Sequence, residues 1–514
     1  MSKMASLPTP PPPPPPPRPH RIVVIGAGCA GLSAARSLTN IPGLTVTVLE
    51  GRTRIGGRID TRTMSNGTSI DMGAAWVNGN SPSNPLTPAA LVGDSRSSAL
   101  QETDWDSSRY FSAVGDVHTA APSPPLSEQD LKRLEELSEV TWSLFKESQS
   151  GKLFTARKGA GIDDDLWATV ESLKSSKFPG VKFLSERDQS LLRFAWLERC
   201  DLEYAAEPES MSTLFWDADY DQPDDMYMYR EGFSSLTKIW AEDLHDIRLS
   251  SKVSSIVVNS GNIPGLGGGE VAVKISGGET LHADACIVTV PLGVLKAGTL
   301  DFQPPLSVEK QEAISRLGVG LLNKVALRFE DCFWEGSSSS SSSAEEDIPH
   351  VIYRVPTKAR QMPEALETQF IVNLKPVTGD NVLVAYFATQ SAVLLEELSN
   401  DKIQAHVLQI LSSMYGEEVE RESNVLDCLV SRWSGDEFAC GSYSYVPVNS
   451  SPRDRAALSS AEEPLFFAGE ACSCGEYIRN KSMNEGGFPA TVFGAYLTGV
   501  KAAKEVGAFL KRKP

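Results

Sequence analysis

The chain has 514 residues, a hydrophobic content of 41%, a formal net charge of −18 and an isoelectric point of about 4.9. This length predicts two or more domains, and the composition predicts a globular protein with sizeable cores. The negative charge disfavours nucleic acid as a partner and favours cationic small molecules, although an acidic surface also serves solubility.

Residues 1–20 contain an unbroken proline run, Pro11–Pro17, which predicts a disordered tail outside the fold. The tail lacks the apolar core of a secretory signal, and no apolar stretch of the chain reaches membrane-spanning length. The eight cysteines are scattered and lack metal-ligand spacing. We therefore expect a cytoplasmic protein with reduced thiols, no metal and no membrane partner.

A nucleotide-binding unit is predicted where the fold begins. Arg21–Ile25 is typical of a buried parallel strand, roughly Ala30–Leu38 of a helix, and Leu44–Leu49 of a second strand. The intervening glycines have the spacing G-x-G-x-x-G and are Gly26, Gly28 and Gly31. They allow a tight turn, close approach of a pyrophosphate and close helix packing. Glu50 ends the second strand, where its carboxylate can accept both ribose hydroxyls, which favours NAD or FAD.

A second glycine turn follows in the pattern E-x-R-x-R-x-G-G-R. The residues that would add donors to a diphosphate are Arg52, Gly56, Gly57 and Arg58. This arrangement resembles the flavin-containing amine oxidase superfamily, in which FAD is held along its whole length. The resemblance implies FAD as the cofactor. It also implies an α/β fold, in which an FAD-binding Rossmann-like domain of the glutathione-reductase type carries an inserted α+β substrate-binding domain.

The segment SIDMGAAWVNG, residues 69–79, is similar to one that lies near the flavin ring in polyamine oxidases and lysine-specific histone demethylases. The resemblance places Gly73, Ala74 and Trp76 at the cofactor, whereas composition alone would make Trp76 a core residue. Relatives commonly have His or Glu, which touches the substrate amine, at the position of Asn78. Asparagine offers hydrogen bonds but no charge, so the identity of the substrate stays open.

Helical spacing with charged faces predicts helices at Leu126–Glu147, Leu166–Ser172 and Ser185–Cys200. The next segment, DLEYAAEPESMSTLFW, is similar to the demethylase and polyamine-oxidase branch, and we expect its Glu203 to bind substrate. The acid-rich run Glu203–Asp225 is either a solvated loop or an anionic funnel for a polycation.

Strands are predicted at Ile247–Val258 and Val271–Ile275. Val253 occupies the position at which relatives make a backbone contact to adenine. The string DACIVTVPLGVL, residues 284–295, is similar to one of the most specific signatures of the family. Its pattern predicts a buried parallel strand followed by a turn at the cofactor.

Lys324 lies in the predicted strand Gly318–Phe329, where an amine is costly to bury without a partner. On the pattern alone, a snorkelling lysine is the alternative. The similarity to the family string G-x-x-N-K implies that Lys324 is catalytic. It would hold a water on the flavin N5 and assist amine oxidation and flavin reoxidation. Residues 337–346 are expected to form a disordered serine-rich loop.

Strands at Phe370–Leu374 and Asn381–Ala388 and a helix from Ala392 are expected next. The string SRW followed by GSYSY is similar to the family pattern. The resemblance implies that Trp433 packs on the flavin and that Tyr445 forms a wall of an aromatic substrate cage. Core packing is the alternative for both rings.

The final segment contains PLFFAGE and a helix that begins near residue 491. Glu470 is expected to end a strand and bind FAD. Thr491 and Val492 are expected to open a helix whose N-terminus faces the flavin. Phe488 is expected to contact substrate. A spacer lies between Cys472 and Gly487, and relatives lack most of it, which leaves its effect on substrate access open.

The expected organisation interleaves three FAD-binding segments with two substrate-binding segments. The FAD-binding segments are 21–90, 245–320 and 426–514, and the substrate-binding segments are 91–244 and 321–425. FAD should bind non-covalently, because no cysteine occupies the attachment context of monoamine oxidases. We also expect a monomer.

The functional hypothesis is the oxidation of polyamines, either spermine and spermidine or their acetylated forms. Hydride would pass to flavin N5, O2 would return H2O2, and the imine would hydrolyse to aldehyde plus amine. A demethylase-like oxidase of methylated peptides is one alternative, although no long coiled-coil insertion interrupts the chain. A catalytically weak FAD-binding scaffold is the other.

Overall fold

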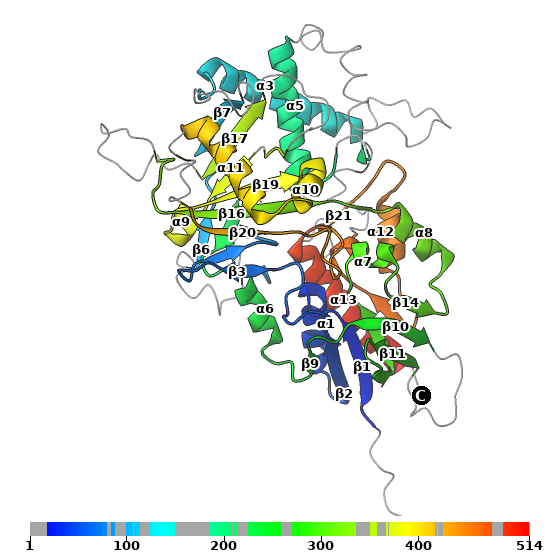
Figure 1. Cartoon of the computed structure of the whole chain (residues 1–514). Coiled ribbons are helices and arrows are strands. Elements are labelled where there is room, and N and C mark those ends of the chain that lie inside the picture. Colours follow the sequence, from blue (N-terminus) through cyan, green and yellow to red (C-terminus); the bar gives the residue numbers. More distant parts are fainter. Residues whose placement is uncertain are drawn as a thin grey trace, which may run out of the picture.

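The structure is a computed structural model of the whole chain (Figure 1). It describes residues 18–79, 84–87, 99–105, 107–113, 124–149, 185–207, 210–212, 215, 225–258, 270–335, 350–356, 366–368, 370–416, 419, 425–474 and 487–512. Several predictions fall outside these ranges: the proline run, the helix Leu166–Ser172, the serine-rich loop, and most of the acid-rich run and of the spacer after Cys472.

A parallel five-stranded sheet forms the centre of the lower half in Figure 1. Its order is β22-β13-β1-β2-β9, with bounds Leu465–Phe467, Ala285–Val288, His20–Ile25, Leu44–Leu49 and Ile247–Arg248. Ile22 and Val24 of β1 pack under the helices α1 (Cys29–Thr39) and α13 (Val492–Lys511). The alternate residues Val23 and Ile25 face the opposite way. Because both faces are covered, the buried parts of the central strands, such as Ile22–Ile25 and Ala285–Val288, are apolar.

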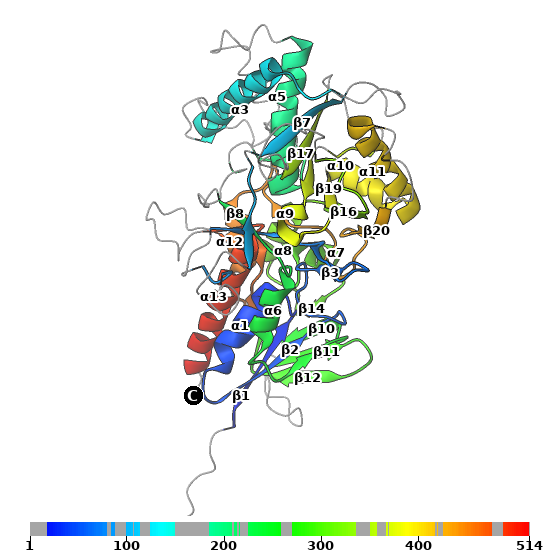
Figure 2. The same cartoon turned by 90° about the vertical axis from the view of Figure 1, so that its left-hand side faces the viewer.

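A four-stranded sheet covers that second face, and Figure 2 shows it on the side opposite α1 and α13. Its order is β12-β11-β10-β14, with bounds Thr280–Ala283, Val271–Ile275, Val253–Val258 and Asp301–Gln303. Three further helices belong to this half: α7 (Leu292–Ala297), α8 (Val308–Arg316) and α12 (Pro452–Ser459). The lower half is therefore a helix–sheet–sheet sandwich.

A six-stranded sheet forms the upper half. Its order is β20-β16-β19-β18-β17-β7, with bounds Val425–Val430, Leu322–Phe329, Val382–Ala388, Phe370–Asn373, Val351–Pro356 and Ser108–Ala113. The helices α10 (Thr389–Glu396) and α11 (Asn400–Tyr415) cover one face, and α5 (Glu186–Arg199) packs on the other. The helix α3 (Glu128–Gln149) pairs with α5, and α9 spans Lys375–Thr378.

Short elements connect the two halves. They are β3 (Thr61–Thr63) with β4 (Ser69–Asp71), β5 (Trp76–Asn78) with β8 (Met226–Tyr229) and β6 (Leu100–Glu102), and β15 (Gly318–Val319) with β21 (Ser444–Tyr445). The helix α6 (Ser234–Ala241) packs with α1 in the lower core through Leu236 and Trp240. The chain thus returns to the lower core at α6, before residue 245, where the second FAD-binding segment is predicted to begin. The domain boundaries stay predictions.

The predicted α/β class is confirmed, and most predicted elements are present. Two details differ. The expected strand Ile247–Val258 is two strands, because Ser250 adopts a left-handed φ of +53° between them. Glu470 does not end a strand: β22 ends at Phe467, and Glu470 begins a 3-10 turn, Glu470–Cys472. No helix in the described part of the chain has the length and apolar character needed to cross a membrane.

Two lysines close the carboxyl ends of neighbouring helices. Lys310 of α8 is fully buried and donates from Nζ to the carbonyls of residues 457, 458 and 460 at the end of α12, at 2.8, 2.8 and 2.7 Å. Lys296 of α7 donates in the same way to the carbonyls of residues 314, 315 and 317 at the end of α8. The three helices are therefore linked in series through their C-terminal carbonyls.

Replacing Lys310 by Met should destabilise the fold, because three helix-terminal carbonyls lose their donor inside the core. We expect a loss of about 2 kcal/mol in the free energy of unfolding, measured by urea denaturation. The matched control is Lys296→Met, which removes the same three-carbonyl contact at an exposed side chain and should cost less.

The pH dependence gives a second check on Lys310. Burial lowers its pKa to about 8, below the value in the unfolded chain. The unfolded state therefore binds more protons between about pH 8 and 10, and the stability difference between the wild type and Lys310→Met should widen as pH rises through that window. A constant difference would show that Lys310 keeps its proton in the fold.

Candidate active site

A cavity of about 350 Å³ lies between the two halves and is lined by both. All the residues predicted for the site line this cavity except Gly31, Tyr445 and Phe488. The N-terminal turns of two helices, α1 and α13, also border it through Cys29, Ala30, Val492 and Ala495. Two helix N-termini on one cavity favour an anionic ligand.

The glycine loop brings α1 close to β1. Gly26 has a φ of +101°, which a side chain would strain. A Cβ on Gly31 would lie 1.9 Å from the Gly26 carbonyl oxygen, so a larger residue would push the helix away. Gly31 thus serves helix packing, as predicted from the spacing, rather than the cavity wall.

Glu50 and Arg52 form the polar floor of one end of the cavity. The buried Glu50 carboxylate accepts the amide hydrogens of Ala27 and Arg52, both at 2.8 Å. The Arg52 guanidinium pairs through Nη1 with Asp436 at 2.5 Å. Its Nη2 is buried without a hydrogen-bond partner among the described residues. Such an unsatisfied cationic donor on a cavity wall fits a ligand with phosphate or hydroxyl oxygens.

A second polar group surrounds Glu470. Its carboxylate pairs with Arg58 at 2.9 Å and accepts the Ser444 hydroxyl at 2.6 Å and the Ala490 amide at 3.1 Å. Burial raises the pKa of Glu470, but Arg58, Arg455 and the Ser444 hydroxyl outweigh burial and hold the pKa below its usual value. Glu470 therefore stays ionised and fixes Arg58 at the cavity.

The predicted helix start at Thr491 is present. The Thr491 hydroxyl accepts the Gly494 amide at 2.9 Å and caps α13. Thr491 and Val492 both line the cavity beside Gly469 and Glu470. The capped N-terminus therefore points its dipole at the same space as Arg58.

Lys324 lies on β16, and its side chain extends from the six-stranded sheet toward the lower half. Its Nζ donates to the carbonyls of Asp71 and Gly73 at 2.9 and 2.7 Å. It also lies 4.9 Å from the ring centroid of Tyr386 and 5.7 Å from that of Trp76. Burial lowers the pKa of Lys324, while the nearby Asp71 opposes that shift. An ammonium has three N–H groups, so one remains for the cavity.

The position of Trp433 is set by hydrogen bonds to Asn323, the residue before Lys324, and to Met72. Its backbone N–H donates to Asn323 Oδ1 at 3.0 Å, and its indole Nε1 donates to the Met72 carbonyl at 3.3 Å. The Asn323 amide is fully buried and donates in turn to Glu396 at 2.8 Å. Asn323 therefore orients the tryptophan that borders the cavity next to Lys324.

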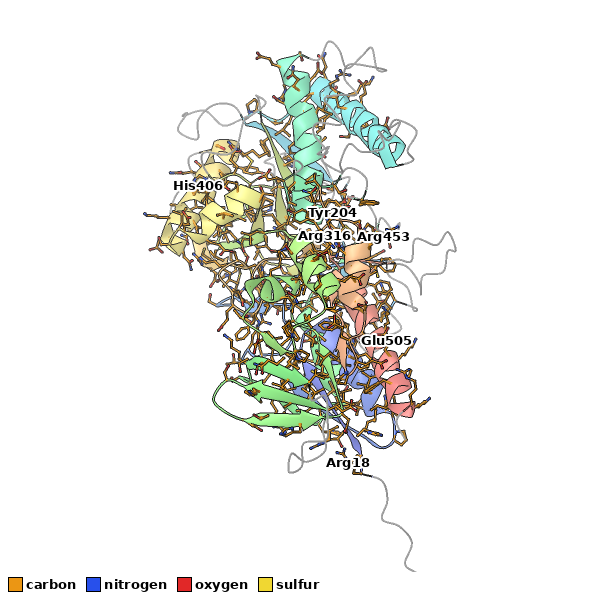
Figure 3. All side chains as sticks on the ribbon, turned by 90° about the vertical axis from the view of Figure 1, so that its right-hand side faces the viewer. Arg18, Tyr204, Arg316, His406, Arg453 and Glu505 are labelled. Carbon is orange, nitrogen blue, oxygen red and sulfur yellow. The ribbon has the colours of Figure 1, made fainter. Side chains whose placement is uncertain are left out.

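The Lys324 end of the cavity is walled by aromatic rings. Trp76 and Tyr386 have ring centroids 5.6 Å apart, and Tyr443 lies on the same cavity. Asn78 and Glu203 also line it, and Glu203 is exposed. Figure 3 shows Tyr204, the residue after Glu203, at the base of α5 where the upper half meets the lower. This end combines flat apolar surfaces with one carboxylate at its rim.

Tyr445 and Phe488 lie away from this space. The Tyr445 ring packs on Gly318, where a Cβ would approach it to 2.4 Å. Phe488 is buried edge-on against Phe493, with centroids 4.7 Å apart. Their predicted contacts with substrate therefore remain predictions without support from the cavity.

The sequence argument did not single out Tyr386, Tyr443 or Phe438, all of which line the cavity. Tyr386 of β19 lies directly opposite Lys324 of β16, on the same face of the sheet. The alternation of side chains along a strand could therefore have identified it. Tyr443 belongs to the GSYSY string, but choosing it over Tyr445 requires the pairing of β21 with β15. No sequence signal marks Phe438.

Comparison with known proteins identifies the family of this chain. Residues 29–507 match the family described as flavin containing amine oxidoreductase, and the chain belongs to that family. Polyamine oxidase 4 of Oryza sativa subsp. japonica is 32% identical over 495 residues, covering 94% of this chain and 88% of that protein. Polyamine oxidase 2 of Arabidopsis thaliana is 30% identical over 493 residues, covering 94% and 87%.

A demethylase homolog and an oxidase of known structure are also similar to this chain. Lysine-specific histone demethylase 1 homolog 1 of Arabidopsis thaliana is 31% identical over 506 residues, and the chain spans about half of its length (52%). A wild-type putrescine oxidase structure bound to putrescine has a TM-score of 0.66 at 19% identity, covering 95% of this chain and 99% of that one. This likeness supports the fold.

Membership of this family makes FAD the cofactor, and the residues present fit it. The unpartnered Nη2 of Arg52 and the N-terminus of α1 offer donors for a diphosphate. We infer that Glu50, Arg52, Val253, Arg58 and Glu470 hold the nucleotide part. Trp76, Trp433 and the start of α13 would border the ring. The cavity joins both groups without a break.

Replacing Arg52 by Met should weaken FAD binding, because the buried Nη2 would no longer reach an oxygen of the cofactor. We expect the Kd of the apoprotein for FAD, measured by calorimetric titration, to rise at least about tenfold. The matched control is Arg54→Met, since Arg54 does not itself line the cavity and its guanidinium is held by the carbonyls of Ile55 and Ile59 and by Asp60. An equal effect of both substitutions would contradict a direct contact of Arg52.

Proposed function

We propose that this protein is an FAD-dependent oxidase of polyamines, either spermine and spermidine or their acetylated forms. The observation that carries the proposal is the placement of Lys324. It presents a buried amine on the cavity wall, beside the faces of Trp76 and Tyr386. Relatives named polyamine oxidases, similar over nearly the whole chain, and the putrescine-bound neighbour support the choice of substrate class.

The chemistry needs one hydride acceptor and one proton-handling group. Bound FAD supplies the first: it would take a hydride from the carbon next to the amine nitrogen and return both electrons to O2, giving H2O2 and an imine that water hydrolyses. Lys324 would supply the second, because two of its N–H groups are held by carbonyls and the third can hold a water. Its lowered pKa favours proton exchange near neutral pH.

The substrate amine would lie between the aromatic walls. Trp76, Tyr386 and Tyr443 offer faces that suit an alkylamine chain and attract a cation. Glu203 at the rim would attract a second, distant ammonium, and Asn78 would add a neutral hydrogen bond. This spacing of one neutral and one charged contact suits a polyamine better than a monoamine.

The second candidate is an oxidase of methylated lysine in a peptide. It is favoured by the demethylase homolog, which matches 96% of this chain at 31% identity. Both functions would use the same amine oxidation inside the cavity. They differ in the part of the substrate outside the cavity, which is the rest of a polyamine in one case and a peptide in the other.

Replacing Lys324 by Met should slow both half-reactions, flavin reduction by amine and flavin reoxidation by O2, by about 100-fold without loss of FAD. The rates are measured by stopped-flow bleaching and recovery of the flavin absorbance. The matched control is Lys252→Met, which removes a lysine from the same cavity where it pairs with Glu437. Rates that are unchanged in Lys324→Met, or equally slowed in both variants, would exclude this role.

A peroxide assay with spermine, spermidine, their acetylated forms, a monoamine and a methyl-lysine peptide tests the substrate class. We expect activity with polyamines that weakens as salt rises, since exposed charges are screened within about 10 Å at 0.1 M. Asn78→Glu should lower the KM for spermine several-fold and leave that for the monoamine unchanged. Asn78→Gln is the uncharged control.

The same assay can reject the proposal. Oxidation of the methyl-lysine peptide alone would favour the second candidate, and no peroxide from any amine would favour a scaffold. If spermine kinetics depend neither on salt nor on Asn78→Glu, the amine does not approach past Asn78 and Glu203.

A further inference from the structure

Three consecutive backbone carbonyls hold the two side chains that border the proposed reaction centre. Lys324 Nζ donates to the carbonyls of Asp71 and Gly73 at 2.9 and 2.7 Å. Between them, the Met72 carbonyl accepts Trp433 Nε1 at 3.3 Å. The segment 71–73 thus sets where both side chains lie in the cavity wall.

The segment is anchored from behind by the carboxylate of Asp71. Both oxygens accept the Phe233 amide hydrogen at 3.0 Å, and Oδ1 accepts the Thr61 hydroxyl at 2.5 Å. The Thr61 oxygen in turn accepts the Ser234 amide at 3.0 Å. Asp71 therefore caps the N-terminus of α6, where the helix dipole favours a negative charge.

Neighbouring segments pack closely around this anchor. Gly232 has a φ of +82°, and a Cβ there would lie 2.3 Å from the Thr61 methyl group. A Cβ on Gly73 would lie 1.9 Å from the Arg58 carbonyl oxygen. The Met72 amide donates to the Asp60 carbonyl at 2.8 Å. Displacing the carbonyls would require α6 or residues 58–60 to move.

The Asp71 carboxylate also acts on Lys324 through its charge. Burial raises the pKa of Asp71, opposed by its bonds from Thr61 and Phe233 and by Lys324. Burial lowers the pKa of Lys324, opposed by Asp71. Each charge therefore favours the ionised form of the other.

Among the described residues, three other charged or titratable groups lie around this pair. Asp60, before β3, is paired with Arg54 at 3.0 Å and Arg62 at 2.9 Å. Tyr386, on β19, is neutral because burial raises its pKa well above the usual value. Tyr443 precedes β21. Asp71 is therefore the carboxylate that supports the Lys324 ammonium most directly.

We propose that Asp71 is a positioning residue of the reaction centre: anchored at the start of α6, it fixes the carbonyls that hold Lys324 and Trp433 and keeps the Lys324 ammonium charged. The inference rests on the proposed function, because the role of Lys324 toward the flavin belongs to that proposal. It adds a residue that touches neither substrate nor cofactor.

The test is a pH titration of the visible flavin spectrum of the holoenzyme without any amine. Wild-type protein should show a transition that Lys324→Met lacks. Asp71→Asn keeps an acceptor oxygen but loses the charge, so the transition should move to lower pH by about one unit or more. The matched control Thr61→Val loosens the same helix cap but leaves the charge of Asp71. It should lower the thermal midpoint about as much as Asp71→Asn and leave the transition near its wild-type pH.

The outcomes separate this inference from the proposed function. A transition that is unmoved in Asp71→Asn, or moved equally in Thr61→Val, overturns the role of Asp71. Identical spectra of wild type and Lys324→Met at every pH overturn it as well, together with the assignment of Lys324. If the transition shifts as expected but no polyamine yields peroxide, the substrate proposal fails and the role of Asp71 stands.

Discussion

The cavity depends on cations that donate to backbone carbonyls across the junction of the two halves. Lys324, from the six-stranded sheet, is bound by the carbonyls of Asp71 and Gly73 below it. Arg58 donates to the Ser442 carbonyl at 2.7 Å and Arg62 to that of Val430 at 2.9 Å. The Lys324 ammonium is buried and would be costly without its carbonyl partners, whereas Arg58 and Arg62 are partly exposed and add bonds across the same junction.

The nucleotide-binding unit could be predicted because its signals are local. The apolar run of β1, the spaced glycines and Glu50 lie within 31 residues, and each constrains its own neighbours. Lys324 is predicted chiefly from its resemblance to the family string G-x-x-N-K, because the cost of burying an amine in an apolar strand can also be avoided by snorkelling. Gly26, Gly28, Glu50 and Lys324 all line the cavity.

Residues chosen by long-range packing could not be predicted in this way. Tyr443 and Tyr445 are both tyrosines of one short string, and their sequence context is nearly the same. The pairing of Gly318 with Tyr445 turns that ring away, and the bond from the Ser444 hydroxyl to Glu470 fixes the strand. These partners lie 26 to 127 residues away along the chain, so only the folded chain distinguishes the two rings.

The serial helix caps have a consequence for the lifetime of the holoenzyme. Pro291 and Val294, at the start of α7, line the cavity, and Arg455 of α12 reaches Glu470 through the Ser444 hydroxyl. Because Lys296 and Lys310 join both helices to α8, fraying of that helix at the surface would loosen two separate walls of the cofactor cavity together. Flavin release and irreversible heat inactivation would then share one rate-limiting opening, governed by a helix that does not touch the cofactor.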